Sequence, residues 1–299
     1  MGAGALGGYY GARLHQAGHK VHFIARGAIL AAMRRNGLRV ERDEEQFNLP
    51  VVAATDDPKE IGTADLVIIT TKGTGLETAV QAVAPVVRED TVVLPLLNGM
   101  DIPERISAIL GRGIVLGGLT YLPANVPVPG VVRQSGDEKP LLLGPLAPEQ
   151  EQSARATAAL LQDAGICSML SADIQKDIWT KFIGFLALAG TQGVSRRTVG
   201  PMLASQDTLA LFKELVGEGE ALAMAAGVGV EAGMAKPLAD WVAQYPEHHK
   251  ASMLQDLENG KPLELESTHG AAIRLGEKLG VSTPACRRVY EALKPYAAG

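Results

Sequence analysis

The sequence predicts an α/β protein with a doubly wound, Rossmann-type N-terminal domain and an all-helical C-terminal domain. Two observations support this prediction. Short apolar runs alternate with helical patterns as far as about residue 148, and only helical patterns follow. Strands and helices that alternate in this order form a parallel sheet covered by helices. We place the boundary near residue 168, which gives domains 1–168 and 169–299 in a chain of 299 residues.

Four apolar runs in the first half have the composition of buried strands, and they lie at 20–26, 64–72, 91–99 and 113–121. Helical spacing of apolar residues characterises the intervening segments, at 6–17, 28–36, 75–87 and 102–110. Turn residues then divide 125–145 into short strands, which we expect to extend the sheet in antiparallel fashion.

Helical patterns occupy the second half, at 148–164, 172–192, 205–226, 231–243, 247–258, 262–279 and 284–296. No uncharged apolar stretch reaches the ~18 residues of a membrane span, and no signal-peptide pattern is present. A net charge of −5 without a basic run argues against nucleic-acid or membrane partners. We therefore expect a cytoplasmic protein.

Cysteine and histidine usage gives no indication of a metal site. Cys167 and Cys286 form neither a disulfide framework nor a spaced ligand set, so two reduced thiols are expected. His248 and His249 are adjacent in the chain. Because adjacent helical side chains point in different directions, we expect both imidazoles to be solvated and no metal to be bound.

The glycines at the start of the chain fit a dinucleotide-binding fingerprint. Gly2, Gly4 and Gly7 have the G-x-G-x-x-G spacing, and a helical pattern and the strand at 20–26 follow. Such glycines let backbone N–H groups approach a pyrophosphate at a helix N-terminus. Only Met1 precedes them, so the strand that feeds this turn is missing. We expect the natural polypeptide to begin upstream of Met1; an accidental match, or a protein that lacks its first strand, is the alternative.

Arg26 indicates the kind of cofactor. A domain that binds NAD usually has Asp or Glu at the end of the second strand, for the ribose 2′-hydroxyl. Here no acidic residue lies between Val21 and Ala28, and Arg26 occupies the strand end. A guanidinium can bind a 2′-phosphate through two hydrogen bonds, so we expect NADP (NADPH) as cofactor. The alternative is a solvated charge at a strand end.

Two further polar residues follow strongly apolar strands. Lys72 ends one run and Asn98 ends the next. Ligands of open α/β sheets bind outside the carboxyl ends of the strands. We expect Lys72 to meet a cofactor phosphate or a substrate carboxylate, and Asn98 to bond the nicotinamide amide. A simple turn at Asn98–Gly99 is the alternative.

A lysine lies in the apolar stripe of the helix expected at 172–192. Helical spacing puts on one face Ile174, Ile178, Lys181, Phe185, Leu188 and Gln192. Burial would lower the pKa of the Lys181 ammonium and make it a proton donor to a substrate oxygen in an interdomain cleft. The alternative is a lysine whose stem is buried and whose head is in water.

The last polar cluster lies between residues 247 and 270. Asn259–Gly260 predicts a turn, and Pro262 suits the first position of a new helix. Glu264 would then fall in the first turn of this helix. Ser252, on the preceding helix, would lie close to it across the turn.

Together these residues resemble the ketopantoate reductase family (2-dehydropantoate 2-reductase) over nearly the whole chain. The motifs that carry the resemblance occur in the same order as in the family. They are "GAGALGGYYGARL", Arg26, "TTK" with Lys72, "LNGM" with Asn98, "PGVVRQSG", "IWTKF" with Lys181, and "SMLQDL" followed by "LELE" with Glu264.

The resemblance implies an oxidoreductase of pantothenate biosynthesis that reduces 2-dehydropantoate (ketopantoate) to pantoate with NADPH. It implies Lys181 as general acid, Glu264 and Ser252 at the substrate, and Asn98 at substrate or nicotinamide. The family has asparagines four and eight residues after the lysine, where this chain has Phe185 and Ala189. A bulkier or more apolar 2-oxo acid, or a non-catalytic NADP(H)-binding protein, therefore stays open, as does a homodimer.

Overall fold

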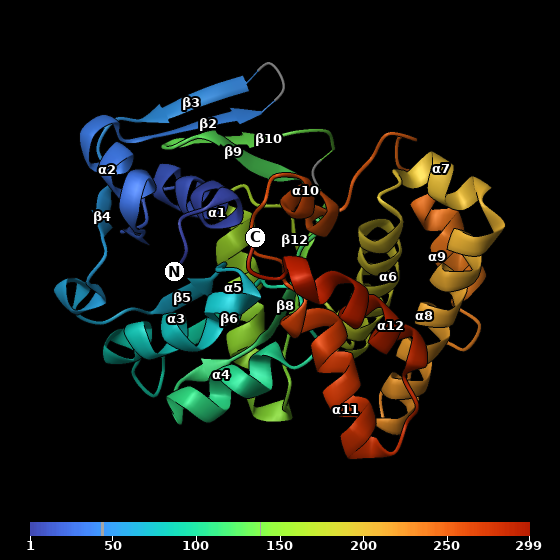
Figure 1. The fold of residues 1–299 in the computed structure, drawn as a ribbon. Coiled ribbons are helices and arrows are strands. Elements are labelled where there is room, and N and C mark those ends of the chain that lie inside the picture. The colour runs from blue at the N-terminus through green and yellow to red at the C-terminus, as the bar shows by residue number, and fades with distance from the viewer. Residues whose placement is uncertain (43–44, 138) are drawn as a thin grey trace. The chain divides into compact units, whose positions relative to one another are not determined.

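A computed structural model, which describes residues 1–42, 45–137 and 139–299, divides the chain into two compact units (Figure 1). Unit 1 comprises Met1–Leu97 and Asp101–Ile174, and unit 2 comprises Asn98–Met100 and Gln175–Gly299. The short loop with Asn98 thus belongs to unit 2, although the chain on both sides of it belongs to unit 1.

Unit 1 has the Rossmann-like alternation that the sequence predicts, and the fold class is confirmed. Its elements in order are α1 (Ala5–Gln16), β1 (His22–Ile24), α2 (Gly27–Asn36), β4 (Ala53–Thr55), β5 (Leu66–Ile69), α3 (Leu76–Val83), β6 (Val92–Pro95), α4 (Ile102–Leu110) and β7 (Ile114–Val115). The pairs β1–β4, β5–β6 and β6–β7 are all parallel. These strands form two separate sheets, β1-β4 and β5-β6-β7, rather than one.

A further, four-stranded sheet has the order β3-β2-β10-β9 and lies at the top of Figure 1. Its strands are β2 (Leu38–Arg42), β3 (Glu45–Leu49), β9 (Ala124–Val128) and β10 (Val131–Gln134). We expected the hairpin β9–β10 to extend the Rossmann sheet, and this was wrong: β10 pairs in parallel with β2. The buried side chains of Val40 and Val132 explain the difference, because this face packs on α1, where Gly8 leaves room for Val132.

Another sheet, of three strands, has the order β12-β11-β8. Its strands are β8 (Gly117–Leu119), β11 (Leu141–Gly144) and β12 (Ser168–Leu170), and α5 (Glu151–Asp163) packs on it. The single strand expected at 113–121 is therefore two strands, because β7 pairs with β6 whereas β8 turns to pair with β11. β12 was not expected, and the boundary placed at residue 168 falls inside unit 1 because β12 pairs with β11.

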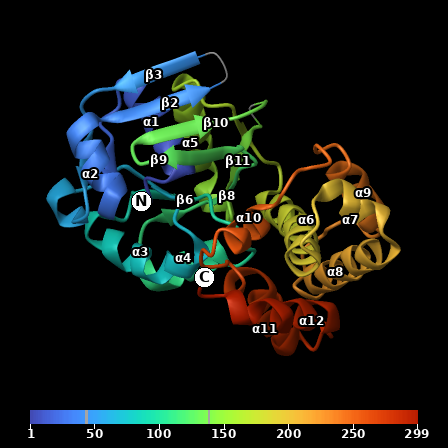
Figure 2. The ribbon, with the colours of Figure 1, turned by 45° about the horizontal axis from the view of Figure 1, so that its top comes forward.

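Unit 2 is helical, as predicted (Figure 2). Its helices are α6 (Ile174–Ser195, whose first residue is counted with unit 1), α7 (Val199–Ala204), α8 (Gln206–Ala225), α9 (Ala235–Val242), α10 (Ser252–Glu258), α11 (Ala271–Leu279) and α12 (Pro284–Leu293). Phe182, Ile183 and Leu186 of α6 are buried in one core with Phe212 and Leu215 of α8. Short 3₁₀ turns in the two units lie at Pro58–Ile61, Gly73–Gly75, Ala84–Val86, Pro148–Gln150 and Lys294–Tyr296.

The segment around Pro262 differs from the prediction. A π-helix spans Glu266–Gly270 and leads directly into α11, and no helix begins at Pro262. The Leu263 N–H donates instead to the Ala297 carbonyl at 3.1 Å, which holds this segment out of the helix. Glu264 therefore precedes the helical segment rather than lying in its first turn.

The described helices include none that is both long and apolar enough to cross a membrane.

Candidate functional site

The glycine turn at the start of α1 is shaped by close backbone approach. Gly2 has a φ of +91°, and a Cβ there would lie 2.9 Å from the Thr71 nitrogen. A Cβ on Gly7 would lie 2.5 Å from Thr70 Oγ1 and would also meet the Gly2 carbonyl. Thr70 Oγ1 donates to the Gly2 carbonyl at 2.7 Å, which fixes the turn against the end of β5. Only glycine fits at either position.

Gly4 differs from the other two glycines, because a Cβ on it would meet no atom within 4 Å. Gly4 caps α1, and no side chain bonds the free N–H groups of that helix end. A helix N-terminus whose backbone N–H groups bond no side chain, and which no side chain obstructs, fits a dinucleotide pyrophosphate. A methyl group at Gly4 would therefore meet no described atom of the protein.

Gly4→Ala is expected to leave the melting temperature within about 2 °C of the parent, since the methyl group meets no protein atom. NADPH binding should weaken at least about tenfold, the equivalent of one lost hydrogen bond. Calorimetry with both proteins measures the two effects, and Gly7→Ala serves as the control that loses stability. Unchanged NADPH affinity in Gly4→Ala would remove the turn from the binding site.

Arg26 and Lys72 have exposed side chains at element boundaries of unit 1. Arg26 follows β1 and caps α2 in extended conformation, and it forms no ion pair with any described residue. Lys72 caps the 3₁₀ turn that comes directly after β5. Both cations thus stand at the carboxyl ends of parallel strands, where the sequence predicts them.

Asn98, Lys181 and Glu264 lie together within unit 2. Lys181 Nζ donates to Asn98 Oδ1 at 3.1 Å, and Asn98 Nδ2 donates to Glu264 Oε2 at 3.4 Å. The amide thus accepts from the ammonium and donates to the carboxylate, so one side chain orients both charged groups. The three residues are all half-buried. They form a polar chain that ends on a potential proton donor.

Burial makes Lys181 a better acid than an ordinary lysine. Desolvation lowers its pKa from 10.5 to about 8, although the charge of Glu264 acts in the opposite direction. Four residues of the stripe on α6 are buried, namely Ile174, Ile178, Leu188 and Gln192, whereas Phe185 is half-buried. A lysine with a pKa near neutral pH can give up its proton readily.

The π-helix Glu266–Gly270 holds the Glu264 segment in place. The Ser267 and Thr268 hydroxyls both donate to the Glu264 carbonyl, at 3.1 and 2.8 Å. His269 is fully buried, and its ring packs on α6 at Gly190, where a Cβ would collide with it. π-Helical turns occur frequently at functional sites. Sequence patterns gave no signal for these residues.

Ser252 is not joined to this cluster. It is the exposed first residue of α10, and among the described residues no hydrogen bond links it to Lys181 or Glu264. Its position is fixed from α6: the Ala251 N–H donates to Gln192 Oε1 at 2.7 Å. The Gln192 amide also donates to the His249 carbonyl at 3.0 Å. Gln192, expected only as a stripe residue, therefore holds the start of α10.

The histidine pair behaves differently from expectation. His248 is exposed, but the His249 ring is half-buried and stacks on Tyr245 with ring centroids 4.4 Å apart. No group of three or more His, Cys, Asp or Glu side chains in the part of the chain that the structure describes could hold a metal ion. Cys167 is exposed and Cys286 is buried, and the two do not form a disulfide with each other.

Comparison with known families matches both units. Residues 1–148 match the model "Ketopantoate reductase PanE/ApbA", and residues 173–297 match its C-terminal counterpart. The chain belongs to the ketopantoate reductase family. The resemblance stated from the motifs is thus confirmed, and the protein is an oxidoreductase of the class that acts on CH–OH groups.

Individual relatives match this member of the ketopantoate reductase family over nearly its whole length. A 2-dehydropantoate 2-reductase of Mesorhizobium japonicum is 30% identical, covering 95% of this chain and 92% of its own. The uncharacterized oxidoreductase YkpB of Bacillus subtilis is 28% identical, and the match covers 100% of this chain and 98% of YkpB. The 2-dehydropantoate 2-reductase from Geobacter metallireducens, whose crystal structure is known, is 29% identical in sequence. Its structure matches with a TM-score of 0.90 and covers 99% of this chain and 98% of its own.

Proposed function

We propose that this protein reduces a 2-oxo acid to the 2-hydroxy acid with NADPH, and that 2-dehydropantoate is the substrate. The chain Lys181–Asn98–Glu264, with a lysine pKa of about 8, is the observation that supports this proposal best. The relatives named 2-dehydropantoate 2-reductase support the choice of substrate.

The glycine turn suits the cofactor, because no protein atom lies where a Cβ on Gly4 would be, at the N-terminus of α1. Gly2, Gly4 and Gly7 would hold the pyrophosphate, Arg26 the 2′-phosphate, and Lys72 a further phosphate. A bound NADPH supplies the hydride for the carbonyl carbon.

The protein's own contribution is proton transfer and orientation. Lys181 gives a proton from Nζ to the substrate oxygen as the carbonyl becomes an alcohol. Asn98 holds the ammonium through its amide oxygen, and Glu264 orients that amide from the other side. The negative charge of Glu264 also keeps more of the lysine protonated at neutral pH. Ser252 at the start of α10 would bind the substrate.

This assignment predicts a pH profile. Because the acid must be protonated, kcat should fall as the pH rises through about 8. Glu264→Gln removes the charge that raises the pKa of Lys181, so its kcat should fall at a lower pH than in the parent. Rates measured from pH 6 to 10 give both curves. Glu266→Gln, an exposed carboxylate two residues away, is the matched control and should keep the parent profile.

Steady-state oxidation of NADPH against a panel of 2-oxo acids tests the function itself. Highest kcat/KM with 2-dehydropantoate supports the proposal, and highest kcat/KM with another 2-oxo acid assigns a different substrate. Tight NADPH binding without turnover of any member would show a non-catalytic nucleotide-binding protein.

Phe185 favours a second candidate, a bulkier or more apolar 2-oxo acid. It lies one turn beyond Lys181 on α6 and is half-buried, whereas Ala189 is fully buried in the core. An aromatic ring near the proton donor suits an apolar substituent better than a hydroxyl group.

Phe185→Asn is therefore expected to raise the ratio of kcat/KM for 2-dehydropantoate to that for phenylpyruvate, by about tenfold. The double variant with Ala189→Asn adds a polar group at a buried position, so its melting temperature must be checked first. A ratio that stays at the parent value in Phe185→Asn would show that this residue does not set specificity.

A further inference from the structure

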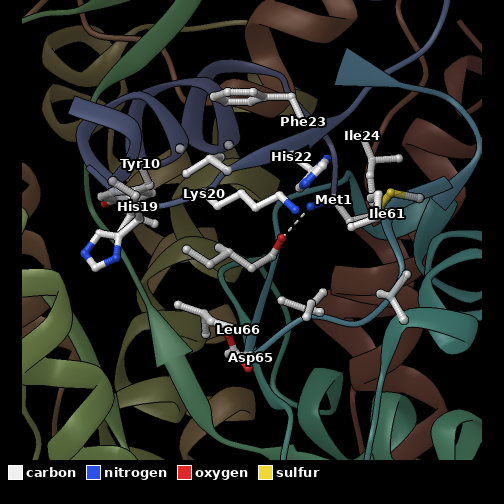
Figure 3. A pocket seen from close by; sticks show the side chains of 18 of the residues that line it. Met1, Tyr10, His19, Lys20, His22, Phe23, Ile24, Ile61, Asp65 and Leu66 are labelled. Carbon is white, nitrogen blue, oxygen red and sulfur yellow. Dashed lines mark hydrogen bonds between the residues drawn. The ribbon is translucent and has the colours of Figure 1, made fainter. Parts of the chain in front are cut away.

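The cavity of about 300 Å³ in unit 1 does not contain the proposed proton donor (Figure 3). It is lined mainly from α1, β1 and β5, and Lys181, Asn98 and Glu264 are not among the described residues that line it. These three residues and Ser252 all belong to unit 2. The way in which unit 2 holds them in place therefore bears on substrate binding.

Gln192 is a polar side chain in the apolar stripe of α6 that the proposed reaction does not use. It is 0% exposed, and its amide makes two hydrogen bonds to the backbone. Oε1 accepts from the Ala251 N–H at 2.7 Å, and Nε2 donates to the His249 carbonyl at 3.0 Å. Because a peptide N–H can only donate and a carbonyl can only accept, these partners fix the orientation of the amide. The two bonds form a clamp on the backbone at 249–251.

The two bonds of the clamp differ in how easily they could be replaced. The His249 carbonyl also accepts from the Val199 N–H at 3.2 Å. Among the described residues, however, the Ala251 N–H donates only to Gln192 Oε1, and Ala251 is buried. A buried N–H without an acceptor costs free energy. The position of Ala251 therefore depends on Gln192.

Ala251 is the residue at which α10 begins. It is the N-cap, and its methyl side chain cannot cap the helix. Its N–H is bonded to Gln192, and its carbonyl accepts from the Gln255 N–H at 3.1 Å in the first turn of α10. Ser252 follows as the first helical residue, with an exposed side chain. The clamp thus ties Ser252 to α6.

Gln192 and Lys181 lie on one face of α6. They are 11 residues apart in the sequence, which is about 20° more than three full turns of an α-helix. One helix therefore carries both the proposed proton donor and the side chain that holds the start of α10.

We propose that Gln192 is a positioning residue for the substrate, which holds Ser252 where its hydroxyl binds the 2-oxo acid. This inference rests on the proposed function, in which Ser252 contacts the substrate. Both ends of the Gln192 amide bond the backbone at 249–251, whereas the Lys181 ammonium is oriented by Asn98. Gln192 therefore governs KM for the 2-oxo acid and leaves kcat unchanged.

Two variants of similar size test the clamp. Gln192→Met removes both hydrogen bonds. Gln192→Glu keeps an acceptor for the Ala251 N–H, but its carboxylate has no proton to donate to the His249 carbonyl. Once protonated, the same carboxyl group has one acceptor and one donor, as the amide has. Burial raises the pKa of a carboxyl group, so acid pH should restore the clamp in this variant.

Gln192→Met is expected to raise KM for the best 2-oxo acid of the panel at least about tenfold, with kcat within about twofold of the parent. The ratio of the Gln192→Glu KM to the parent KM at the same pH should approach one at pH 5. By pH 9 it should approach the ratio found for Gln192→Met. Steady-state rates across this pH range give both quantities.

Gln255→Met is the matched control. The Gln255 amide donates to the Lys250 carbonyl at 2.8 Å in the same segment, but it is exposed and bonds α10 to its own N-terminal segment rather than to α6. Its loss should leave KM at the parent value. Hydrogen exchange of the Ala251 amide, which needs no turnover, should be at least about tenfold faster in Gln192→Met and unchanged in Gln255→Met.

The parent KM in Gln192→Met would overturn the proposal. So would a fall of kcat in step with the rise of KM, since general loss of structure has that effect, or a Gln192→Glu ratio that does not vary with pH. Ser252→Ala separates the clamp from the reaction. A raised KM in Ser252→Ala but not in Gln192→Met rejects the clamp alone, and the parent KM in Ser252→Ala removes Ser252 from the substrate site. Absence of turnover in the parent would refute the proposed function itself, and the clamp's role with it.

Discussion

Replacing Lys181 with alanine is expected to lower kcat by at least about 100-fold, the low end of the effect of a positioned acid. The substitution removes the ammonium of the Lys181–Asn98–Glu264 chain, whose pKa burial lowers to about 8. NADPH binding should be unchanged within about twofold, since the residues proposed to hold the phosphates of NADPH belong to unit 1. Stopped-flow turnover and fluorescence titration measure the two quantities.

Lys176→Ala is the matched control for this experiment. Lys176 lies on the same helix, but its ammonium faces Glu231 at 3.4 Å rather than Asn98. Removing it deletes the same charge without touching the polar chain, so kcat should stay close to that of the parent. If Lys181→Ala also kept the parent kcat, the Lys181 ammonium of the parent would have no role in proton transfer.

Replacing Arg26 with alanine is expected to weaken NADPH binding by about 10- to 100-fold, because hydrogen bonds to charged groups contribute ~1.5–3 kcal/mol. NADH lacks the 2′-phosphate, so its dissociation constant should change little. The parent protein should accordingly bind NADPH much more tightly than NADH. Isothermal titration with both nucleotides on both proteins gives all four constants.

Arg35→Ala controls for charge, since Arg35 is an exposed arginine at the other end of α2. Loss of general positive charge would weaken binding equally in both variants, and loss of a specific contact would not. Equal affinity of the parent for NADPH and NADH would refute the assignment of Arg26.

Strong helical periodicity made most of the helices predictable, although α7 was not expected. α4 was expected at 102–110 and spans Ile102–Leu110, and α6 and α8 differ from prediction by a few residues at their ends. The hairpin β2–β3 was missed because only Leu38, Val40 and Leu49 of its strands are buried, amid charged side chains. β12 was missed because three residues are too short to show a period.

The site shows the same division between local and distant information. The turn at Gly2, Gly4 and Gly7 is local, and its spacing was predicted together with the helix and the strand that follow it. The bond between Lys181 and Asn98 joins residues 83 apart, and that between Asn98 and Glu264 joins residues 166 apart. No periodicity carries such a contact, so only the resemblance to a family put these residues in one site. The turn expected at Asn259–Gly260 is present, but the helix expected to follow it at Pro262 is not.

Because of the π-helix Glu266–Gly270, the position of Glu264 depends more on the number of residues in this segment than on which residues they are. A π-helical turn contains one residue more than the α-helical turn that would replace it. Deleting one residue would restore α-helical bonding and rotate Glu264 by about 100° around the axis of α11. The carboxylate would then leave Asn98, although every side chain of the cluster was still present. Across homologous chains, this segment should therefore accept substitutions far more often than insertions or deletions.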